Sequence, residues 1–313
     1  MTQHICLACE QSLEIAAPSP YHRHCLKKIF GTTKTLSLKF STEEIYYQAQ
    51  KMVGQMSISG VQEKLSVYPN KKDGSIDVAA VGGSHILKPS PSRFPHLAEN
   101  ENFFMNLATA LSIETPAHGL FALSDGPLSY VVKRFDRDDV GGKIPVEDFV
   151  QLLGGRDKYA GSIEQIGRFL MRHSSIPFID TQKLFVRTLF NFVIGNGDAH
   201  MKNFSMILLP DQGYRLAPAY DIVSSRLVIP NEKDDLALSL NGKRNNITTN
   251  DFLKLAEYLE IEKKRYEQIM GTLRDLKNIF EEKIFHSPLP PQMKEQAKRI
   301  FLKRFHVLLA KAE

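Results

Sequence analysis

The sequence predicts an α+β protein with a strand-rich first part and a helical second part. Residues 65–135 contain short apolar or alternating segments separated by glycine and proline, which is typical of β-strands. Beyond residue 162, apolar residues recur at intervals of three and four, which is typical of amphipathic helices. The polar stretch 136–142 marks the change, so we expect three parts, with boundaries at 1–36, 37–135 and 136–313.

Length and composition favour an ordinary globular protein. The chain has 313 residues, of which 42% are hydrophobic and 24% charged, enough for one large or two moderate domains. The net charge of +5 suits an acidic ligand such as a nucleotide, but it does not predict direct DNA binding. No apolar run approaches the roughly 20 residues that span a bilayer, and a signal-peptide profile is lacking. We therefore expect a cytoplasmic protein without membrane contact.

The N-terminal segment carries a possible metal site. All three cysteines lie here, and with one histidine they give a Cys-x2-Cys…His-x2-Cys pattern: Cys6, Cys9, His22 and Cys25. Three thiolates and one imidazole can bind Zn²⁺ tetrahedrally, and four protein ligands make such a site structural. Incidental thiols on a flexible end are the alternative. A nucleic-acid-binding knuckle is less favoured, because the basic patch that follows is thin.

A small-residue loop follows the first predicted helix, residues 41–53. It reads Ser57-Ile-Ser59-Gly60-Val-Gln62-Glu-Lys, and it leads into a strand. The bend at Gly60 would let backbone N–H groups approach phosphates closely. An ordinary hairpin turn is the alternative, and the chain contains no Walker loop.

A lysine and a glutamate are expected to meet in the strand-rich part. Strands are predicted at 78–81 and 85–87, and the second ends at Lys88. An amphipathic helix is predicted at 98–111, with Glu101 in its first turn. A lysine at the end of a strand, held in place by a glutamate of a helix, is well suited to bind phosphates with its positive charge. The alternative is that Lys88 is an ordinary exposed lysine at a strand end and that the acidic residues only interact favourably with the helix dipole.

The second part is expected to be mostly helical. A strand at 128–135 precedes it, and helices are predicted at 162–174, 180–195, 249–260, 263–285 and 291–311. A short strand at 204–209 follows the helix that ends near residue 195.

The loop between that helix and that strand holds the strongest functional pattern. Asp198 and Asn203 stand five residues apart, as do the catalytic Asp and the metal-binding Asn of the protein-kinase loop. Asp221 follows a second apolar segment, 18 residues beyond Asn203. One carboxylate can steer an acceptor hydroxyl, while the amide oxygen and the other carboxylate can hold Mg²⁺. Turn chemistry explains most isolated Asp-x4-Asn patterns, but the combination favours phosphoryl transfer.

Motifs along the chain together resemble one family. They are Ser-Ile-Ser-Gly-Val-Gln-Glu-Lys (57–64), His-Ile-Leu-Lys-Pro (85–89), Glu-Asn-Glu (99–101), Lys-Arg-Phe-Asp-Arg (133–137), Pro-Val-Glu-Asp-Phe (145–149), Gly-Asn-Gly-Asp-Ala-His-Met-Lys-Asn-Phe-Ser (195–205) and Leu-Ala-Pro-Ala-Tyr-Asp-Ile (216–222). In this order the chain resembles the HipA family of bacterial Ser/Thr kinases, which are toxins of toxin–antitoxin operons. The resemblance implies a two-lobed, protein-kinase-like fold with a β-rich N-lobe and an α-helical C-lobe.

The resemblance also implies ATP- and Mg²⁺-dependent phosphorylation of a protein on Ser or Thr. Asp198 would be the catalytic Asp, with His200 and Lys202 supporting its loop, and Asn203 and Asp221 would bind Mg²⁺. Further residues would bind ATP: Ser59, Gly60, Val61 and Gln62 in the covering loop, Lys88 with Glu101 at the phosphates, and the backbone of Lys133 to Phe135 at the adenine edge. Ser57 and Ser59 would be autophosphorylated, which would lower activity; unmodified turn serines are the alternative.

The chain departs from the standard family pattern at its N-terminus. It is shorter, and the Cys/His segment stands where the family has a subdomain before the loop. Both features resemble the short HipT branch of the three-protein HipBST systems, which implies a small HipS-like partner and a helix-turn-helix HipB-like antitoxin. The implied substrate is an aminoacyl-tRNA synthetase, whose phosphorylation stalls translation. A small-molecule phosphotransferase of the antibiotic-kinase type and a pseudokinase scaffold are the alternatives.

Overall fold

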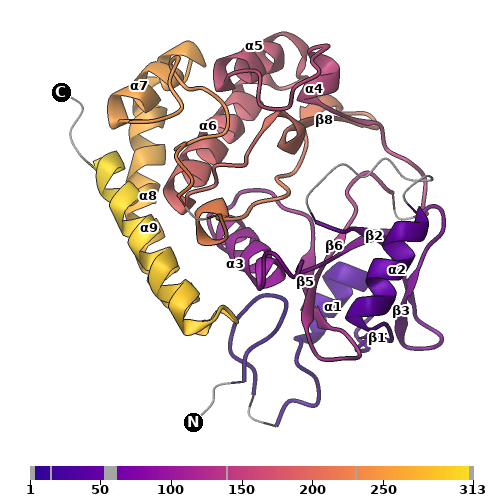
Figure 1. Ribbon diagram of the computed structural model, residues 1–313. Helices are drawn as coiled ribbons and strands as arrows, with labels where there is room; N and C mark the ends of the chain where they lie inside the picture. Colours follow the sequence, from indigo (N-terminus) through magenta and orange to yellow (C-terminus); the bar gives the residue numbers. More distant parts are fainter. Residues whose placement is uncertain (1–3, 15, 53–61, 139, 230, 310–313) are drawn as a thin grey trace. The chain divides into compact units, whose positions relative to one another are not determined.

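The structure, a computed structural model, describes residues 4–14, 16–52, 62–138, 140–229 and 231–309 (Figure 1). The chain divides into two compact units. Unit 1 comprises Met1–Asn106, Pro116–Gly142 and Lys283–Pro290, and unit 2 comprises Leu107–Thr115, Lys143–Glu282 and Pro291–Glu313. Each unit therefore draws on separate stretches of the sequence.

Unit 1 is built on a six-stranded sheet in the order β1-β3-β2-β4-β6-β5. The strands are β1 (Ser37–Leu38), β2 (Leu65–Asn70), β3 (Ser75–Val78), β4 (His85–Pro89), β5 (His118–Ala122) and β6 (Leu128–Lys133). Strand β1 pairs parallel with β3, and the other neighbours are antiparallel. Strand β4, which carries Lys88, therefore lies inside the sheet, between β2 and β6.

Helices and the N-terminal segment complete the core of unit 1. Its helices are α1 (Arg23–Phe30), α2 (Thr42–Met52) and the greater part of α3 (Leu97–Ala110). Side chains of α1, including Leu26 and Phe30, pack in one cluster with Leu87 and Val131 of the sheet. Cys6 belongs to the same cluster. The N-terminal segment is thus part of this core.

Unit 2 combines helices with a small sheet. The antiparallel sheet has the order β7-β8-β9, with β7 (Val146–Asp148), β8 (Ser205–Leu209) and β9 (Gly213–Leu216). The helices are α4 (Phe149–Leu152), α5 (Ile163–His173), α6 (Pro177–Ile194), α7 (Thr249–Tyr258), α8 (Lys263–His286, with Lys283–His286 in unit 1) and α9 (Pro291–Leu309), with short 3-10 turns η1 (Met201–Asn203) and η2 (Ser225–Leu227). Helix α6 is buried along most of its length, because apolar residues occupy several of its faces.

The structure confirms most of the predicted helices and corrects one strand. Observed α5, α6, α7, α8 and α9 match the expected helical segments to within a few residues. The strand predicted at 78–81 is wrong, since β3 ends at Val78. The turn at Asp73-Gly74 pairs Asn70 with Ser75, and in this register Val78 lies opposite Val67. Helix α1 and strand β5 have no counterpart among the predictions.

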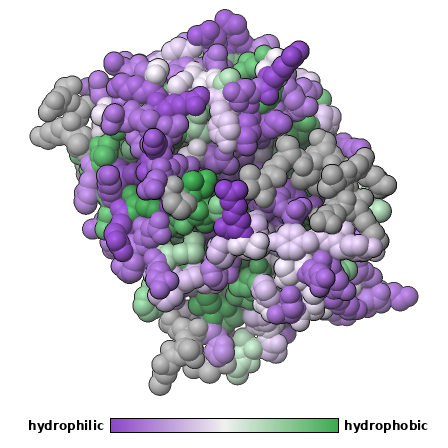
Figure 2. Space-filling model, in the orientation of Figure 1, coloured by the Kyte–Doolittle hydropathy of each residue, from purple (hydrophilic) through white to green (hydrophobic). Residues whose placement is uncertain are grey.

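Hydrophilic residues make up most of the molecular face drawn in Figure 2, with smaller apolar areas among them. Large exposed apolar side chains within the described ranges include Val81, Val140, Phe178 and Phe285. Among the helices that the structure describes, none combines the length and the apolar character that crossing a membrane requires.

Candidate active site

Lys88 and Glu101 form a buried ion pair in unit 1. The Lys88 Nζ lies 2.6 Å from Glu101 Oε1, and the two residues are only 4% and 2% exposed. Strand β4 places the lysine opposite Tyr130 of β6, and its Nζ lies 5.5 Å from the centre of that ring. A buried ammonium is tolerated only when it is paired. Since a lysine carries three N–H donors, Lys88 can bind a phosphate while it keeps this ion pair.

The predicted nucleotide loop is described only at its end. Ser57, Ser59, Gly60 and Val61 lie outside the described residues. Gln62 is described, and its Nε2 donates a hydrogen bond to the Pro89 carbonyl at 2.8 Å, at the end of β4. The end of the loop is thereby attached to the strand that carries Lys88.

The predicted adenine-edge residues continue strand β6. The Lys133 N–H donates to the Ala117 carbonyl at 2.8 Å, and the Arg134 N–H donates to the Ser84 carbonyl at 2.9 Å. These two N–H groups therefore already donate hydrogen bonds within unit 1. An adenine contact by Lys133 or Arg134 would therefore have to use their carbonyl oxygens.

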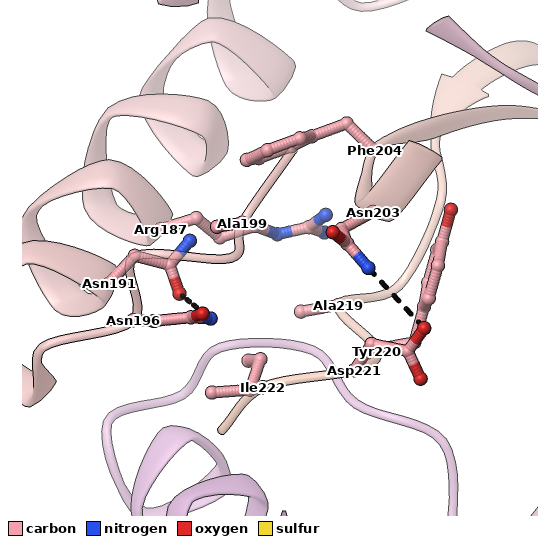
Figure 3. A pocket seen from close by; sticks show the side chains of 10 residues that line it. All are labelled: Arg187, Asn191, Asn196, Ala199, Asn203, Phe204, Ala219, Tyr220, Asp221 and Ile222. Carbon is pink, nitrogen blue, oxygen red and sulfur yellow. Dashed lines mark hydrogen bonds between the residues drawn. The ribbon is translucent and has the colours of Figure 1, made fainter. Parts of the chain in front are cut away.

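The loop of Asp198 in unit 2 is held by side chains on both sides. Helix α6 ends at Ile194 and is capped by Gly195, whose φ of +71° suits glycine. The Asn196 side chain bonds to Asn191 at 3.1 Å, and its oxygen accepts the Asp198 N–H at 3.2 Å. A small pocket opens beside the loop (Figure 3), lined by Arg187, Asn191, Asn196, Ala199, Asn203, Phe204, Ala219, Tyr220, Asp221 and Ile222. The loop is therefore a fixed part of the helical unit.

Asn203 and Asp221 meet at this pocket. The Asn203 Nδ2 lies 3.3 Å from Asp221 Oδ2, as Figure 3 shows, although the residues are 18 positions apart. The Asn203 oxygen accepts the His200 N–H at 3.0 Å. Two oxygens bound to one Mg²⁺ at about 2.1 Å lie about 3 Å apart, so the two side chains are close enough to share an ion. To offer its oxygen beside Asp221, Asn203 would have to turn its amide and give up the contact with the His200 N–H.

Tyr159 is a site residue that sequence reasoning missed. Its hydroxyl donates to Asp198 Oδ1 at 2.6 Å, and its ring meets the His200 ring edge-to-face at 5.4 Å. Burial, followed by the carboxylate acceptor, raises the Tyr159 pKa, so the tyrosine stays a donor. The residue lies 39 positions before Asp198. No local pattern links it to the loop.

Glu232 is a second residue without a sequence signal. Its carboxylate accepts a hydrogen bond from the Ser225 hydroxyl at 2.7 Å, and that hydroxyl in turn accepts the Gly197 N–H at 2.7 Å. A Cβ at Gly197 would lie 2.5 Å from the carboxyl carbon of Glu232. A side chain at this position would therefore have to displace the Glu232 carboxylate from its place beside the loop.

His200 and Lys202 occupy different positions in the loop. Burial is the main reason that the His200 pKa is lowered, so this ring is neutral at pH 7. Its buried Nδ1 has no hydrogen-bond partner in the part of the chain that the structure describes. The Lys202 carbonyl accepts the Tyr220 hydroxyl at 2.8 Å. The support of the loop by these two side chains stays a prediction.

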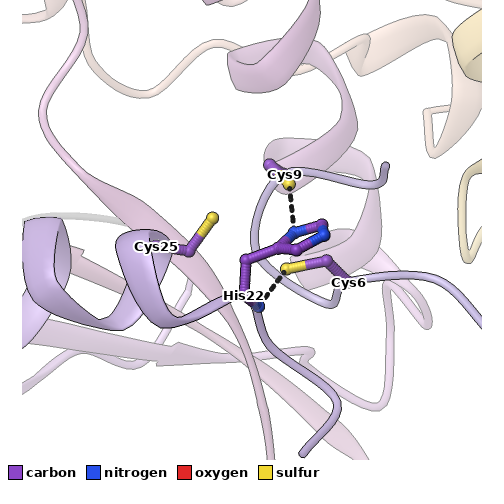
Figure 4. A group of neighbouring side chains, drawn as sticks. All are labelled: Cys6, Cys9, His22 and Cys25. Carbon is purple, nitrogen blue, oxygen red and sulfur yellow. Dashed lines mark hydrogen bonds between the residues drawn. The ribbon is translucent and has the colours of Figure 1, made fainter. Parts of the chain in front are cut away.

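The cysteines and the histidine of the N-terminal segment come together in unit 1. One potential ligand atom from each of Cys6, Cys9, His22 and Cys25 lies within 4.8 Å of all the others (Figure 4). The three thiols are free of disulfides. These four residues, called the Cys/His set below, form a second candidate site in the chain.

Comparison with known proteins identifies the family. Residues 56–280 match the model of the HipA-like C-terminal domain. A Haemophilus influenzae protein named "Putative kinase" is 35% identical over 201 residues, which are 60% of this chain and 58% of that protein. The serine/threonine-protein kinase toxin HipA of Shewanella oneidensis is 28% identical over 191 residues, 54% of this chain and 43% of that protein. The chain spans about half the length of these curated relatives.

A solved structure confirms the predicted fold. It is the Shewanella oneidensis MR-1 complex of HipA, HipB and operator DNA, and one of its chains matches with a TM-score of 0.68 at 20% identity. The match covers 85% of this chain and 73% of the other. At this identity the likeness concerns the fold alone, which is the α+β, HipA-like kinase fold expected from the sequence.

Proposed function

This chain belongs to the family of proteins with a HipA-like C-terminal domain, and from this premise we propose that it is an ATP- and Mg²⁺-dependent Ser/Thr protein kinase. The observation that carries the proposal is that Asn203 meets Asp221 at the end of the same loop in which Asn196 holds the backbone of Asp198. The buried Lys88–Glu101 pair supports it, because this pair supplies the phosphate-binding cation that such a kinase needs.

In this proposal Asp198 orients the acceptor hydroxyl and takes its proton as the oxygen bonds to the γ-phosphorus. The bond to the leaving ADP oxygen breaks in the same displacement. The Tyr159 hydroxyl donates a hydrogen bond to Asp198 Oδ1, so it would hold the carboxylate in place and leave the other oxygen for the substrate. Tyr159 is therefore a positioning residue.

The metal and phosphate roles follow from the donor types. Asn203 and Asp221 would hold Mg²⁺, which would neutralise charge on the phosphates. Lys88, kept in place by Glu101, would contact the α- and β-phosphates. Gln62 and the loop before it would cover them, and the backbone near Lys133 and Phe135 would bind the adenine edge.

We further propose that the kinase is the toxin of a toxin–antitoxin system of the HipT type. Its substrate would be an aminoacyl-tRNA synthetase, and it would regulate itself by phosphorylating Ser57 or Ser59. A HipB-like antitoxin and a small HipS-like protein would be its partners. Support for the antitoxin comes from the structural relative, which is a complex of HipA with HipB and operator DNA.

The intact mass of the protein after incubation with Mg-ATP tests the kinase proposal. We expect phosphate on the wild-type chain, and a loss of about 10² to 10⁴ in rate for Asp198→Asn, because the proton acceptor is removed. Asp211→Asn is a matched control, since Asp211 is an exposed loop residue whose φ of +59° asparagine tolerates.

Other outcomes separate the alternatives. Equal phosphate on wild type and Asp198→Asn would contradict the role of Asp198. Bound ATP without transfer to the chain or to synthetases, with toxicity kept in Asp198→Asn, would indicate a pseudokinase scaffold. Transfer to an aminoglycoside in place of protein would indicate a small-molecule phosphotransferase.

A further inference from the structure

The Cys/His set has the geometry of a tetrahedral metal site. Zn²⁺ binds thiolates at about 2.3 Å, which places tetrahedral sulfur ligands about 3.8 Å apart. The four ligand atoms lie within 4.8 Å of one another, and Cys9 Sγ and His22 Nδ1 are 3.4 Å apart. Cys6 and Cys25 are buried at 0% and 7% exposure, so three thiols and an imidazole converge at a largely enclosed point.

The second nitrogen of His22 prepares the first one for a metal. His22 Nε2 lies 3.2 Å from the Ser12 carbonyl, which is only an acceptor, so Nε2 carries the proton. In the neutral ring the lone pair is then on Nδ1, the atom that faces Cys9. Metal-bound histidines commonly donate their other N–H to a carbonyl in this way.

The backbone near the set also suits a thiolate. The His22 N–H donates to Cys6 Sγ at 3.3 Å, as drawn in Figure 4. Between the first two cysteines the chain forms a tight turn, in which the Glu10 N–H donates to the Cys6 carbonyl at 2.8 Å and Glu10 has a φ of +60°. A disulfide could use only two of the three sulfurs, and it would leave the third thiol and His22 unexplained.

The turn that holds the first two cysteines, residues 6–10, contacts the sheet and helix α3. The Leu120 N–H of β5 donates to the Leu7 carbonyl at 2.9 Å. A Cβ at Gly119 would lie 2.9 Å from the Ala8 Cβ, so β5 and the turn are in close contact.

Two buried asparagines of α3 bind the same turn. Asn106 Nδ2 donates to the Ala8 carbonyl at 2.6 Å, and Asn102 Nδ2 donates to Glu10 Oε1 at 2.8 Å. Asn102 and Asn106 are 0% and 8% exposed. Losing the turn would leave buried amides without these acceptors, which is costly. Asn102 is the sequence neighbour of Glu101, the partner of Lys88.

We propose that Cys6, Cys9, His22 and Cys25 bind one structural Zn²⁺, which fixes residues 6–10 against β5 and α3 and thereby supports the position of Glu101. The metal site does not depend on the proposed kinase activity. Its effect on nucleotide binding does rest on that proposal, through the Lys88–Glu101 pair.

Metal analysis of the purified full-length chain tests the site. We expect about one zinc per chain in the wild type, as four protein ligands hold one ion, and a loss of most of it in Cys9→Ser. His24→Ala is the matched control, because His24 is exposed and stacks on His22 but is outside the set. Cobalt substitution should give the visible absorption of tetrahedral thiolate coordination in the wild type and in His24→Ala, but not in Cys9→Ser. Wild type without zinc and without cobalt absorption would overturn the site.

Hydrogen exchange measures whether zinc binding at the Cys/His set stabilises helix α3. After zinc removal by a chelator, amides of residues 97–106 should exchange at least about ten-fold faster, as expected if ordering of the turn and helix is linked, and re-added zinc should restore protection. Unchanged exchange in α3 would overturn the support of Glu101 while leaving the metal site in place. Asp198→Asn should keep its zinc, so a failure of the kinase proposal can be distinguished from a failure of this one.

Discussion

Asp221 combines a functional position with an unfavourable backbone. Its φ of +53° lies in the left-handed region, which costs about 1 kcal/mol or more for most residues that have a Cβ. Asparagine and aspartate tolerate this region better than other residues do. The surrounding contacts hold the carboxylate beside Asn203, so the strain occurs at the proposed metal position.

Substitutions of Asp221 should therefore separate stability from activity. Asp221→Asn keeps a residue suited to this backbone but removes the charge, so we expect a loss of about 10² to 10³ in Mg²⁺-dependent turnover. Its free energy of unfolding should change by less than about 1 kcal/mol. Urea unfolding and phosphoryl-transfer rates measure the two quantities. Turnover that remained intact would remove Asp221 from the metal site.

The Lys88–Glu101 pair should behave as a buried ion pair in stability measurements. Lys88→Met removes the cation 2.6 Å from Glu101, and we expect a loss of about 3 to 5 kcal/mol in the free energy of unfolding. In Lys88→Met/Glu101→Met most of that loss should be recovered, because no buried charge of the pair remains. Both variants should lack kinase activity. Equal destabilisation of the single and double variants, measured by urea unfolding, would contradict the ion-pair explanation.

At the scale of elements, the end of α6 decides where the Asp198 loop begins. Gly195 has a φ of +71°, and a Cβ there would lie 2.8 Å from Ile300 Cγ2 of α9 and 3.1 Å from Arg226 Cδ of η2. Glycine thus satisfies two separate requirements, the backbone angle and the close packing of neighbouring elements.

Two alanine substitutions can separate those requirements. Gly154 has a φ of +65°, and no atom lies within 4 Å of the position that a Cβ would take, so Gly154→Ala reports the backbone cost alone, about 1 kcal/mol. Gly195→Ala adds the clash, and we expect about 1 to 3 kcal/mol of further destabilisation, together with reduced phosphoryl transfer. Urea unfolding gives the difference. Equal losses for the two variants would mean that α9 and η2 adjust freely.

At the scale of the whole molecule, the N-terminal segment is part of unit 1 although it precedes the family match. The match begins at residue 56, whereas the Cys/His set ends at Cys25. Tyr21 stacks on Phe121 with ring centres 4.8 Å apart and donates its hydroxyl to the Leu120 carbonyl at 2.8 Å. The edge strand β5 is therefore covered by this segment, which protects it from pairing with other chains.

Unit 1 should lose stability in mild acid. Burial lowers the pKa of His85 and of His118 to about 4, and nearby Lys133 lowers that of His85 further. Unfolded histidines bind protons near pH 6.5. Between pH 6.5 and 4 the unfolded state therefore holds more protons, and stability falls as the pH falls, by up to about 1.4 kcal/mol per pH unit for each histidine.

Urea unfolding between pH 7.5 and 4.5 measures this dependence. His118→Asn keeps a donor for the Pro116 carbonyl, which His118 Nδ1 contacts at 2.8 Å, and it should reduce the slope by about one proton. His306→Asn, which replaces an exposed histidine, is the matched control. An unchanged slope in His118→Asn would show that this ring already titrates near its ordinary pKa in the folded state.

The sequence by itself determined the features that depend on local order along the chain. The spacing of Asp198 and Asn203, the Cys-x2-Cys…His-x2-Cys pattern and the helices of the second part are of this kind, since periodicity and spacing are properties of neighbouring residues. The pairing of Lys88 with Glu101 could also be expected, because a short connection joins their strand and helix.

Only the tertiary structure decided which distant residues complete the sites. Tyr159 reaches Asp198, Glu232 closes on Gly197, and Asn102 binds the turn of the first two cysteines, across separations that leave no periodic trace in the sequence. Burial, which lowers the pKa values of His85 and His118, is likewise a property of packing. Such contacts depend on how whole elements pack, and a linear pattern does not encode that arrangement locally.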